Sequence, residues 1–311
     1  MLSWPVFVSE ADYVAHRGDV GFWRPYLVEI LGRHGLVDAR HEPEAGIGPT
    51  YPTFLYGHVA VKLFGYRRWW REGQAAEQAA HAVLATDPAI LAPRLLASGQ
   101  LFENGRESWP YLISERVPGL AWHKAGLTAG QRQVVAAELG DQIRRVQALH
   151  PAGVTRRVAW PELDVTAAAR RSSLPPQLVA QVDGYLARLG PFDPVFVNGD
   201  MMYRHIFVED GRLSAIIDWG DAIITDRHYE LAKLHLDTFD GDKGLLRAFL
   251  AASDWPVAGD FAQKGLAHAL YRQAFGLVQH HSMDVFYKLP DQLPLQEIVT
   301  LEQLAEVLFA V

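Results

Sequence analysis

Two aspartates, Asp200 and Asp218, are candidates for chemistry because each follows a short apolar segment and each lies in a turn. The apolar segments have the composition of strands, and the Asp210-Gly211 pair between the two aspartates is typical of a tight hairpin. Because a hairpin folds the chain back, we expect both carboxylates at the same edge. Phosphoryl transfer uses such a pair: one carboxylate orients or deprotonates the attacking hydroxyl, and the other holds a metal ion on the phosphates. The alternative is two ordinary hairpins whose aspartates suit turns.

The sequence around both aspartates resembles the catalytic core of the aminoglycoside phosphotransferase family, whose members are relatives of the protein kinases. Asn198-Gly199-Asp200 stands where this family has His-Gly-Asp, and residues 217–220 match its metal-binding Ile-Asp-(Phe/Trp)-Gly. Residues 226–232 are similar to its Asp-Pro-x-Tyr-Asp-Leu-Ala. The resemblance, which extends from about residue 45 to residue 232, implies that Asp200 is the catalytic base and Asp218 the principal Mg²⁺ ligand.

The chain departs from the family five residues after Asp200, where His205 replaces the usual asparagine that binds a second metal ion. Neutral imidazole is a poorer ligand for Mg²⁺ and a better one for softer ions such as Mn²⁺. Three interpretations of His205 stay open: a metal ligand, a hydrogen-bond partner of Asp200 or of a phosphate oxygen, and a packing residue. Asn198 in place of the family's histidine is a smaller departure, because an amide can also brace the backbone there by donating and accepting hydrogen bonds. The neighbouring Arg204 either meets a phosphate or is an exposed arginine.

Upstream, residues 59–62 (Val-Ala-Val-Lys) resemble the kinase strand whose lysine neutralises the α- and β-phosphates of ATP, which makes Lys62 a nucleotide-binding candidate. Two glutamates of the following predicted helix, Glu77 and Glu72, compete as the partner of Lys62, and we favour Glu77.

Two further segments have the expected positions for nucleotide binding. The turn at 46–51 contains Gly46 and Gly48 and would offer backbone N–H groups to phosphates, with a plain hairpin turn as the alternative. Ser114, Glu115 and Arg116 resemble the hinge between the kinase lobes, whose backbone meets the adenine ring; the last two side chains are open to a purely structural role.

The hydrophobic periodicity predicts the elements that position these residues. Strands are expected at 53–56, 58–64, 111–114, 195–197, 206–208 and 215–217. Helices are expected at 10–36, 69–85, 129–149, 177–189, 227–238, 243–252, 260–281 and 297–309. This order predicts an α+β, two-lobed, protein-kinase-like fold: a nucleotide-binding N-terminal lobe at 1–117, with extra N-terminal helices, and a mainly helical C-terminal lobe at 118–311.

The composition narrows the function classes. The 311 residues are 49% hydrophobic and 21% charged, which is typical of a globular protein. The net charge of −7 gives no attraction for nucleic acid or anionic lipid and is compatible with a cationic substrate. The absence of cysteine excludes disulfides and thiolate metal sites. No apolar run is long enough to span a bilayer and no signal peptide is recognisable, so we expect a cytoplasmic protein without membrane or nucleic-acid partners.

The predicted function is therefore an ATP-dependent transfer, with GTP as the alternative donor and Mg²⁺ or Mn²⁺ as the metal, to a hydroxyl of a small molecule. By resemblance the acceptor is an aminoglycoside or a related amino or polyhydroxy compound. A nucleotide-binding pseudokinase is the alternative function, and a protein kinase is disfavoured because no Ala-Pro-Glu follows Asp218. The oligomeric state stays open. Candidate acceptor-site residues are Asp221, Asp226, Asp237, Asp240, Asp242, Asp284, Tyr271, Phe275 and His281.

Overall fold

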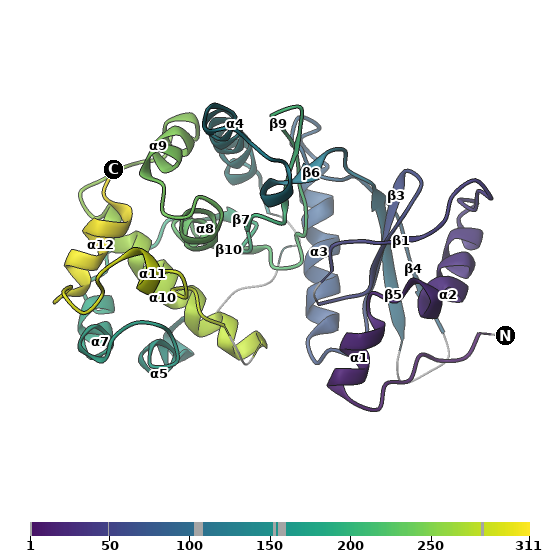
Figure 1. Ribbon diagram of the computed structural model, residues 1–311, viewed down its shortest axis with the longest axis horizontal. Helices are drawn as coiled ribbons and strands as arrows, with labels where there is room; N and C mark the ends of the chain where they lie inside the picture. Colours follow the sequence, from purple (N-terminus) through teal and green to yellow (C-terminus); the bar gives the residue numbers. More distant parts are fainter. Residues whose placement is uncertain (1, 49, 103–107, 152–153, 155–159, 281–282) are drawn as a thin grey trace.

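The N-terminal lobe is built on a five-stranded antiparallel sheet with the order β1-β2-β3-β5-β4 (Figure 1). The computed structural model describes residues 2–311 except 49, 103–107, 152–153, 155–159 and 281–282. The strands are β1 (Glu44–Ala45), β2 (Thr53–Tyr56), β3 (Val59–Leu63), β4 (Leu95–Leu101) and β5 (Trp109–Glu115). The predicted strands at 53–56, 58–64 and 111–114 correspond to β2, β3 and β5, whereas β1 and β4 were not predicted.

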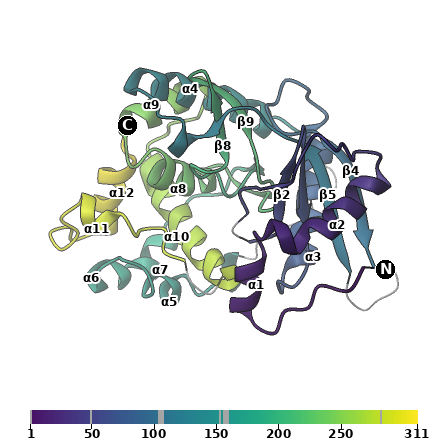
Figure 2. The ribbon, with the colours of Figure 1, turned by 45° about the vertical axis from the view of Figure 1, so that its right-hand side comes forward.

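Helices cover both faces of this sheet (Figures 1 and 2). On one face, α1 (Glu10–His16) and α2 (Val20–Arg33) pack against the alternate β3 residues Val59, Val61 and Leu63. The other β3 face, which carries Lys62, is turned toward α3 (Trp70–Leu84). Pleating therefore aims Lys62 away from the N-terminal helices and toward the junction with the second lobe.

The single helix expected at 10–36 is wrong, because the chain forms two helices there. Asp19 caps α2 by accepting hydrogen bonds from the N–H groups of Gly21 and Phe22. A second helix therefore begins inside the stretch that was predicted as one helix. Gly35, with a φ of 66°, follows the end of α2, as expected from its position in the sequence.

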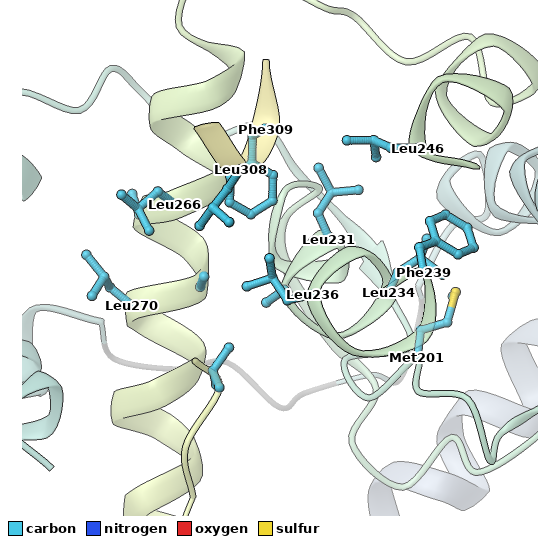
Figure 3. Packing of buried hydrophobic residues seen from close by; sticks show 14 of the residues in the cluster. Met201, Leu231, Leu234, Leu236, Phe239, Leu246, Leu266, Leu270, Leu308 and Phe309 are labelled. Atoms are coloured by element: carbon cyan, nitrogen blue, oxygen red, sulfur yellow. The ribbon is translucent and has the colours of Figure 1, made fainter. Parts of the chain in front are cut away.

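The C-terminal lobe is mainly helical and has one large core (Figure 3). Its helices are α4 (Ala129–Gln147), α5 (Val165–Ala169), α6 (Pro176–Val179), α7 (Val182–Leu186), α8 (Tyr229–Lys233), α9 (Lys243–Ala252), α10 (Phe261–His280), α11 (Leu289–Gln292) and α12 (Leu301–Phe309). Short 3-10 turns lie at Trp122–Lys124 and Trp160–Glu162, and a π-helical turn (Leu234–Thr238) continues α8. The helix expected at 177–189 is divided between α6 and α7.

A β-rich segment interrupts these helices and carries both candidate aspartates. Strands β8 (Ile206–Glu209) and β9 (Arg212–Ile216) form a hairpin, with β6 (Leu120–Ala121) beside β8. The turn contains Asp210 and Gly211 at φ values of 50° and 75°, the backbone that a two-residue hairpin requires. Strand β7 (Pro194–Val197) pairs with β10 (Ile223–Asp226), which was not predicted.

These elements confirm the predicted α+β, two-lobed fold. The division at 117/118 stays a prediction, and α3 links the two lobes: Ala80, Val83 and Leu84 pack in the C-terminal core. Among the described residues, no helix has both the length and the apolar character that a membrane crossing demands.

Candidate functional site

Lys62 forms ion pairs with one residue from each lobe. Its Nζ lies 2.7 Å from Glu77 Oε2 of α3 and 2.9 Å from Asp218 Oδ1. Of the two competing glutamates, Glu77 is buried against Lys62, whereas Glu72 is exposed in the first turn of α3. Burial alone would lower the pKa of Lys62, but the charges of Asp218 and Glu77 outweigh it and raise the pKa. Lys62 is therefore a permanent cation at the junction of the lobes.

Asp218 is held in an uncommon backbone conformation, with a φ of 58°. Aspartate tolerates this left-handed region better than most residues do. The Asn198 side-chain amide donates to the Asp218 carbonyl at 3.1 Å, and the next residue, Trp219, is fully buried. Burial raises the pKa of the Asp218 carboxyl, but Lys62 and His205 more than compensate and hold it well below its usual range. The carboxylate is thus ionised and fixed in direction.

Asp200 lies in the loop after β7, and this loop is braced from α8. Buried Glu230 accepts hydrogen bonds from the backbone N–H of Asn198 at 2.8 Å and of Gly199 at 3.2 Å. Gly199 has a φ of 81°, and a Cβ there would lie 2.5 Å from the Asp221 carbonyl oxygen, so only glycine fits. Asn198 Oδ1 then accepts from the Asp200 N–H at 3.0 Å.

The Asp200 carboxylate is surrounded by groups that stabilise its negative charge. Arg272 Nη2, from α10, donates to Asp200 Oδ1 at 3.1 Å, and His205 Nδ1 lies 3.6 Å from Oδ2. Burial raises the pKa of Asp200, but His205, Arg272 and Lys233 together bring it below its ordinary value. Asp200 is therefore an ionised carboxylate with a fixed orientation.

His205 lies between the two aspartates and is 2% exposed. Its Nδ1 is 2.8 Å from the Asp200 backbone carbonyl, which can only accept, so Nδ1 carries a proton. Its Nε2 lies 3.4 Å from Asp218 Oδ2 and has no hydrogen-bond partner among the described residues. The two carboxylates, expected at one edge of the hairpin, thus lie on either side of one imidazole.

A cavity of about 930 Å³ lies between the lobes and is here called the inter-lobe cavity. Its wall includes Lys62, Asp200, His205, Asp218 and Arg272. Gly48 lies on its wall, and a Cβ there would lie 2.4 Å from the Tyr51 carbonyl oxygen. Gly46 is not on the wall; its N–H donates to the Thr53 carbonyl at 2.8 Å and extends the β1–β2 pairing. Of the two predicted loop glycines, one therefore faces the cavity.

Ser114, Glu115 and Arg116 do not line the inter-lobe cavity. Ser114 is paired within the sheet, and the N–H groups of Glu115 and Arg116 already donate to the carbonyls of Arg94 and His58 at 2.9 and 2.8 Å. The two charged side chains form surface ion pairs with Arg94 and Glu44. These N–H groups are therefore not free to meet an adenine ring.

Most of the predicted acceptor residues have other partners. Asp242 caps α9, Asp226 bonds to His228, Asp284 bonds to Ser173, and Asp237 and Asp240 meet Lys288. Tyr271 and Phe275 pack against Trp160, with ring centroids 5.3 and 6.0 Å apart, and His281 lies outside the described residues. Of the predicted acceptor aspartates, Asp221 alone lines the inter-lobe cavity.

Three residues that were not predicted complete the site: Glu230, Arg272 and Lys233. Glu230 occupies the aspartate position of the motif at 226–232, so the motif itself contained its signal. Arg272 and Lys233, both on the cavity wall, lie on helices without any local motif.

Solved structures with the same fold are phosphotransferases. Aminoglycoside 2'-phosphotransferase-IIIa, solved with GDP, has a TM-score of 0.64 and 16% identity, over 92% of this chain and 95% of that one. Macrolide 2'-phosphotransferase MphH from Brachybacterium faecium has a TM-score of 0.58 and 20% identity, over 92% and 98%. APH(2")-IIa, solved with streptomycin and ATP, has a TM-score of 0.59 and 13% identity, over 91% and 98%.

At these identities the structures show a shared fold. The family model for the phosphotransferase enzyme family, APH, matches residues 36–263, well over half of the chain. This match includes Lys62, Glu77, Asp200, His205 and Asp218, and it confirms the resemblance that the motifs indicated. The chain therefore belongs to the phosphotransferase enzyme family, APH, and is a small-molecule phosphotransferase.

Proposed function

We propose that the inter-lobe cavity binds ATP, with GTP as the alternative donor, and that its terminal phosphoryl group passes to a hydroxyl of a small acceptor. One observation carries this proposal: Lys62, Asp218, His205 and Asp200 form an unbroken chain of contacts, each within 4 Å of the next. A cation for phosphates and two ionised carboxylates are what phosphoryl transfer requires. The relatives solved with ATP or GDP support a nucleotide donor.

Each residue of this chain of contacts has a proposed role. The Lys62 ammonium binds phosphate oxygens, and the loop that carries Gly48 covers them from the N-terminal lobe. Asp200 accepts a hydrogen bond from the acceptor hydroxyl and takes its proton as the new oxygen–phosphorus bond forms, the bond from the γ-phosphorus to the bridging oxygen breaks, and ADP leaves. Because Arg272 keeps Asp200 ionised and a weak base, the main contribution of Asp200 is to orient the hydroxyl.

The residues between the aspartates also fit a divalent metal ion. A buried Nε2 lone pair beside the Asp218 carboxylate is unfavourable unless a proton or a cation lies between them. The bond from Nδ1 to a backbone carbonyl is the usual second interaction of a metal-binding histidine. We propose that Asp218 and His205 hold Mn²⁺ or Mg²⁺, with phosphate oxygens and water as further ligands. When bound, the ion neutralises the charge that develops on the phosphoryl group.

The phosphotransferase proposal is tested by exchanging each aspartate for its neutral isostere. Asp200→Asn should bind ATP like the parent in calorimetry but transfer label from γ-labelled ATP to mixed hydroxyl compounds at least ~10²-fold more slowly. Asp218→Asn should lose the metal-dependent part of ATP binding. Asp254→Asn is the matched control, because Asp254 also has a positive φ, of 50°, but its side chain is 82% exposed. Full transfer by either site variant would remove these roles.

The metal proposal is tested by spectroscopy as well as by activity. Mn²⁺ bound with ADP should show nitrogen hyperfine coupling in electron paramagnetic resonance, and His205→Asn should abolish this coupling. The same variant should keep Mg²⁺-dependent transfer and bind Mn²⁺ about tenfold more weakly or worse, since an amide oxygen replaces a softer nitrogen ligand. Mn²⁺ bound without nitrogen coupling would contradict ligation by His205 and favour a proton in that position.

A further inference from the structure

The inter-lobe cavity extends past Asp200 to a wall formed by the C-terminal lobe. Three basic residues line this wall: Arg204 from the loop after Asp200, Lys233 at the end of α8, and Arg272 from α10. Lys62 and Asp218 lie on the other side of the imidazole of His205. Since the nucleotide phosphates belong with Lys62 and Asp218, the space beside Asp200 is where an acceptor hydroxyl must approach.

The charges on this wall are not balanced by carboxylates. Arg272 bonds to Asp200, and Asp221 adds to the negative charge around Arg272. Arg204 contacts the Met202 sulfur at 2.9 Å and lies over the Tyr203 ring at 5.8 Å, neither of which is an acid. The Lys233 ammonium makes no hydrogen bond or ion pair with any residue in the described part of the chain. On this wall of the cavity, three cations therefore face two carboxylates, Asp200 and Asp221, and Asp200 is the proposed catalytic residue.

Among the three basic residues, Lys233 indicates an anion site most clearly, because its side chain is half-buried without a counter-ion. The charged groups acting on it are Asp200, Arg272, Asp237 and Arg204, all of the C-terminal lobe. Of these, Asp237 is already bonded to Tyr287 at 3.0 Å. Burial and the neighbouring arginines lower the pKa of Lys233 from its ordinary value, as expected for an ammonium that lacks a close anion. An anionic ligand would supply the missing partner.

Given the phosphotransferase function proposed above, we propose that the acceptor is an anionic hydroxyl compound, whose carboxylate or phosphate group is bound by Lys233 and Arg204 while its hydroxyl faces Asp200. A polycationic acceptor placed there would meet like charges instead. The charges on this wall thus oppose the cationic acceptor expected from the net charge and the family resemblance. Hydroxy acids and sugar phosphates share the required chemistry.

The test measures acceptor binding separately from nucleotide binding. Calorimetry would use protein with and without ADP and Mn²⁺, titrated with gluconate as the carboxylate, glycerol phosphate as the phosphate ester, glycerol as the neutral probe and ethanolamine as the cation. Gluconate or glycerol phosphate should bind more tightly than the other two, and the better of them identifies the source of the anionic group. Lys233→Met should weaken that binding about 10- to 100-fold, the loss of one charge-assisted hydrogen bond, and leave ADP binding unchanged.

Two further variants separate the charge from the fold. Lys233→Arg should restore anion binding, and Lys264→Met is the matched control, because Lys264 in α10 already pairs with Asp260 and does not line the cavity. Equal or tighter binding of ethanolamine, or anion binding unaffected by Lys233→Met, would overturn the proposal, as would a failure of both anions to bind. Failure of ADP and ATP to bind would instead remove the proposed phosphotransferase site, whatever the anions do.

Discussion

Asp200 illustrates how buried charges at this site constrain one another. A carboxylate that takes a proton from a hydroxyl benefits from a raised pKa, yet Arg272 and His205 lower the pKa of Asp200. In phosphoryl transfer the hydroxyl proton is lost late, so a weak base in a fixed orientation is sufficient. Arg272 is almost completely buried and gives Asp200 that orientation through a hydrogen bond of 3.1 Å. For the proposed role of Asp200, direction therefore matters more than basicity.

Glu230 makes stability depend on pH. Burial raises its pKa from 4.5 to about 7, although the Asn198 and Gly199 N–H groups act in the opposite direction. Below pH 4.5 the residue is protonated in both the folded and the unfolded chain. As pH rises to 7 the unfolded chain ionises first, so folding loses about 3 kcal/mol. The difference in unfolding free energy between the parent and Glu230→Gln should therefore fall by about 3 kcal/mol between pH 4 and 8.

Urea denaturation at a series of pH values measures this difference directly. Infrared spectroscopy adds an independent check, because the parent should show a protonated-carboxyl band at pH 5.5 that the Glu230→Gln variant lacks. A parent-minus-variant difference that is flat with pH would show that Glu230 is ionised throughout, as two N–H donors alone would favour.

Residues of the site could be predicted where their signal was local. Asp200, Asp218 and Lys62 each follow or belong to a strand and stand in a recognisable run of neighbours. Arg272 had no such signal, because 72 residues separate it from Asp200 and its position depends on how α10 packs. Lys233 ends a short helix, and only the folded structure brings Arg272 and Arg204 close to it. Tertiary packing therefore decided the acceptor side of the site.

At the scale of elements, the alternation in β3 was visible in the sequence, whereas β4 gave no such pattern. In β3 a buried residue alternates with a half-buried one over five residues. In β4 the alternation is broken near Gly99. A Cβ at this position would lie 2.2 Å from the Tyr111 hydroxyl oxygen, so packing requires a glycine inside the strand. Helix ends failed for a different reason: the Asp19 side chain caps α2 inside the stretch that was predicted as one helix.

The whole molecule depends on residues outside the family-matched segment. Residues 36–263 carry the motifs, but α1 and α2 precede this segment and cover one face of its sheet (Figure 2). Arg272 follows it, as do the residues of α12 that pack on α10. The N-terminal helices therefore stabilise strand β3, which presents Lys62. Helix α10 orients the Asp200 carboxylate, which lies beyond His205 from Lys62.

Trp23 tests this dependence, because it is fully buried between α2 and the sheet. Trp23→Ala should cost about 3–5 kcal/mol of unfolding free energy. The control is Val28→Ala on the same helix, where the side chain is 52% exposed and the change should stay within about 0.5 kcal/mol.

Since each lobe has its own core, unfolding need not be two-state, and hydrogen exchange should show β2, β3 and β5 losing protection before α4 and α10. ATP affinity should fall with that protection, because Lys62 is then presented by a partly unfolded strand. Unchanged exchange in Trp23→Ala would show that the sheet holds Lys62 in place without the N-terminal helices.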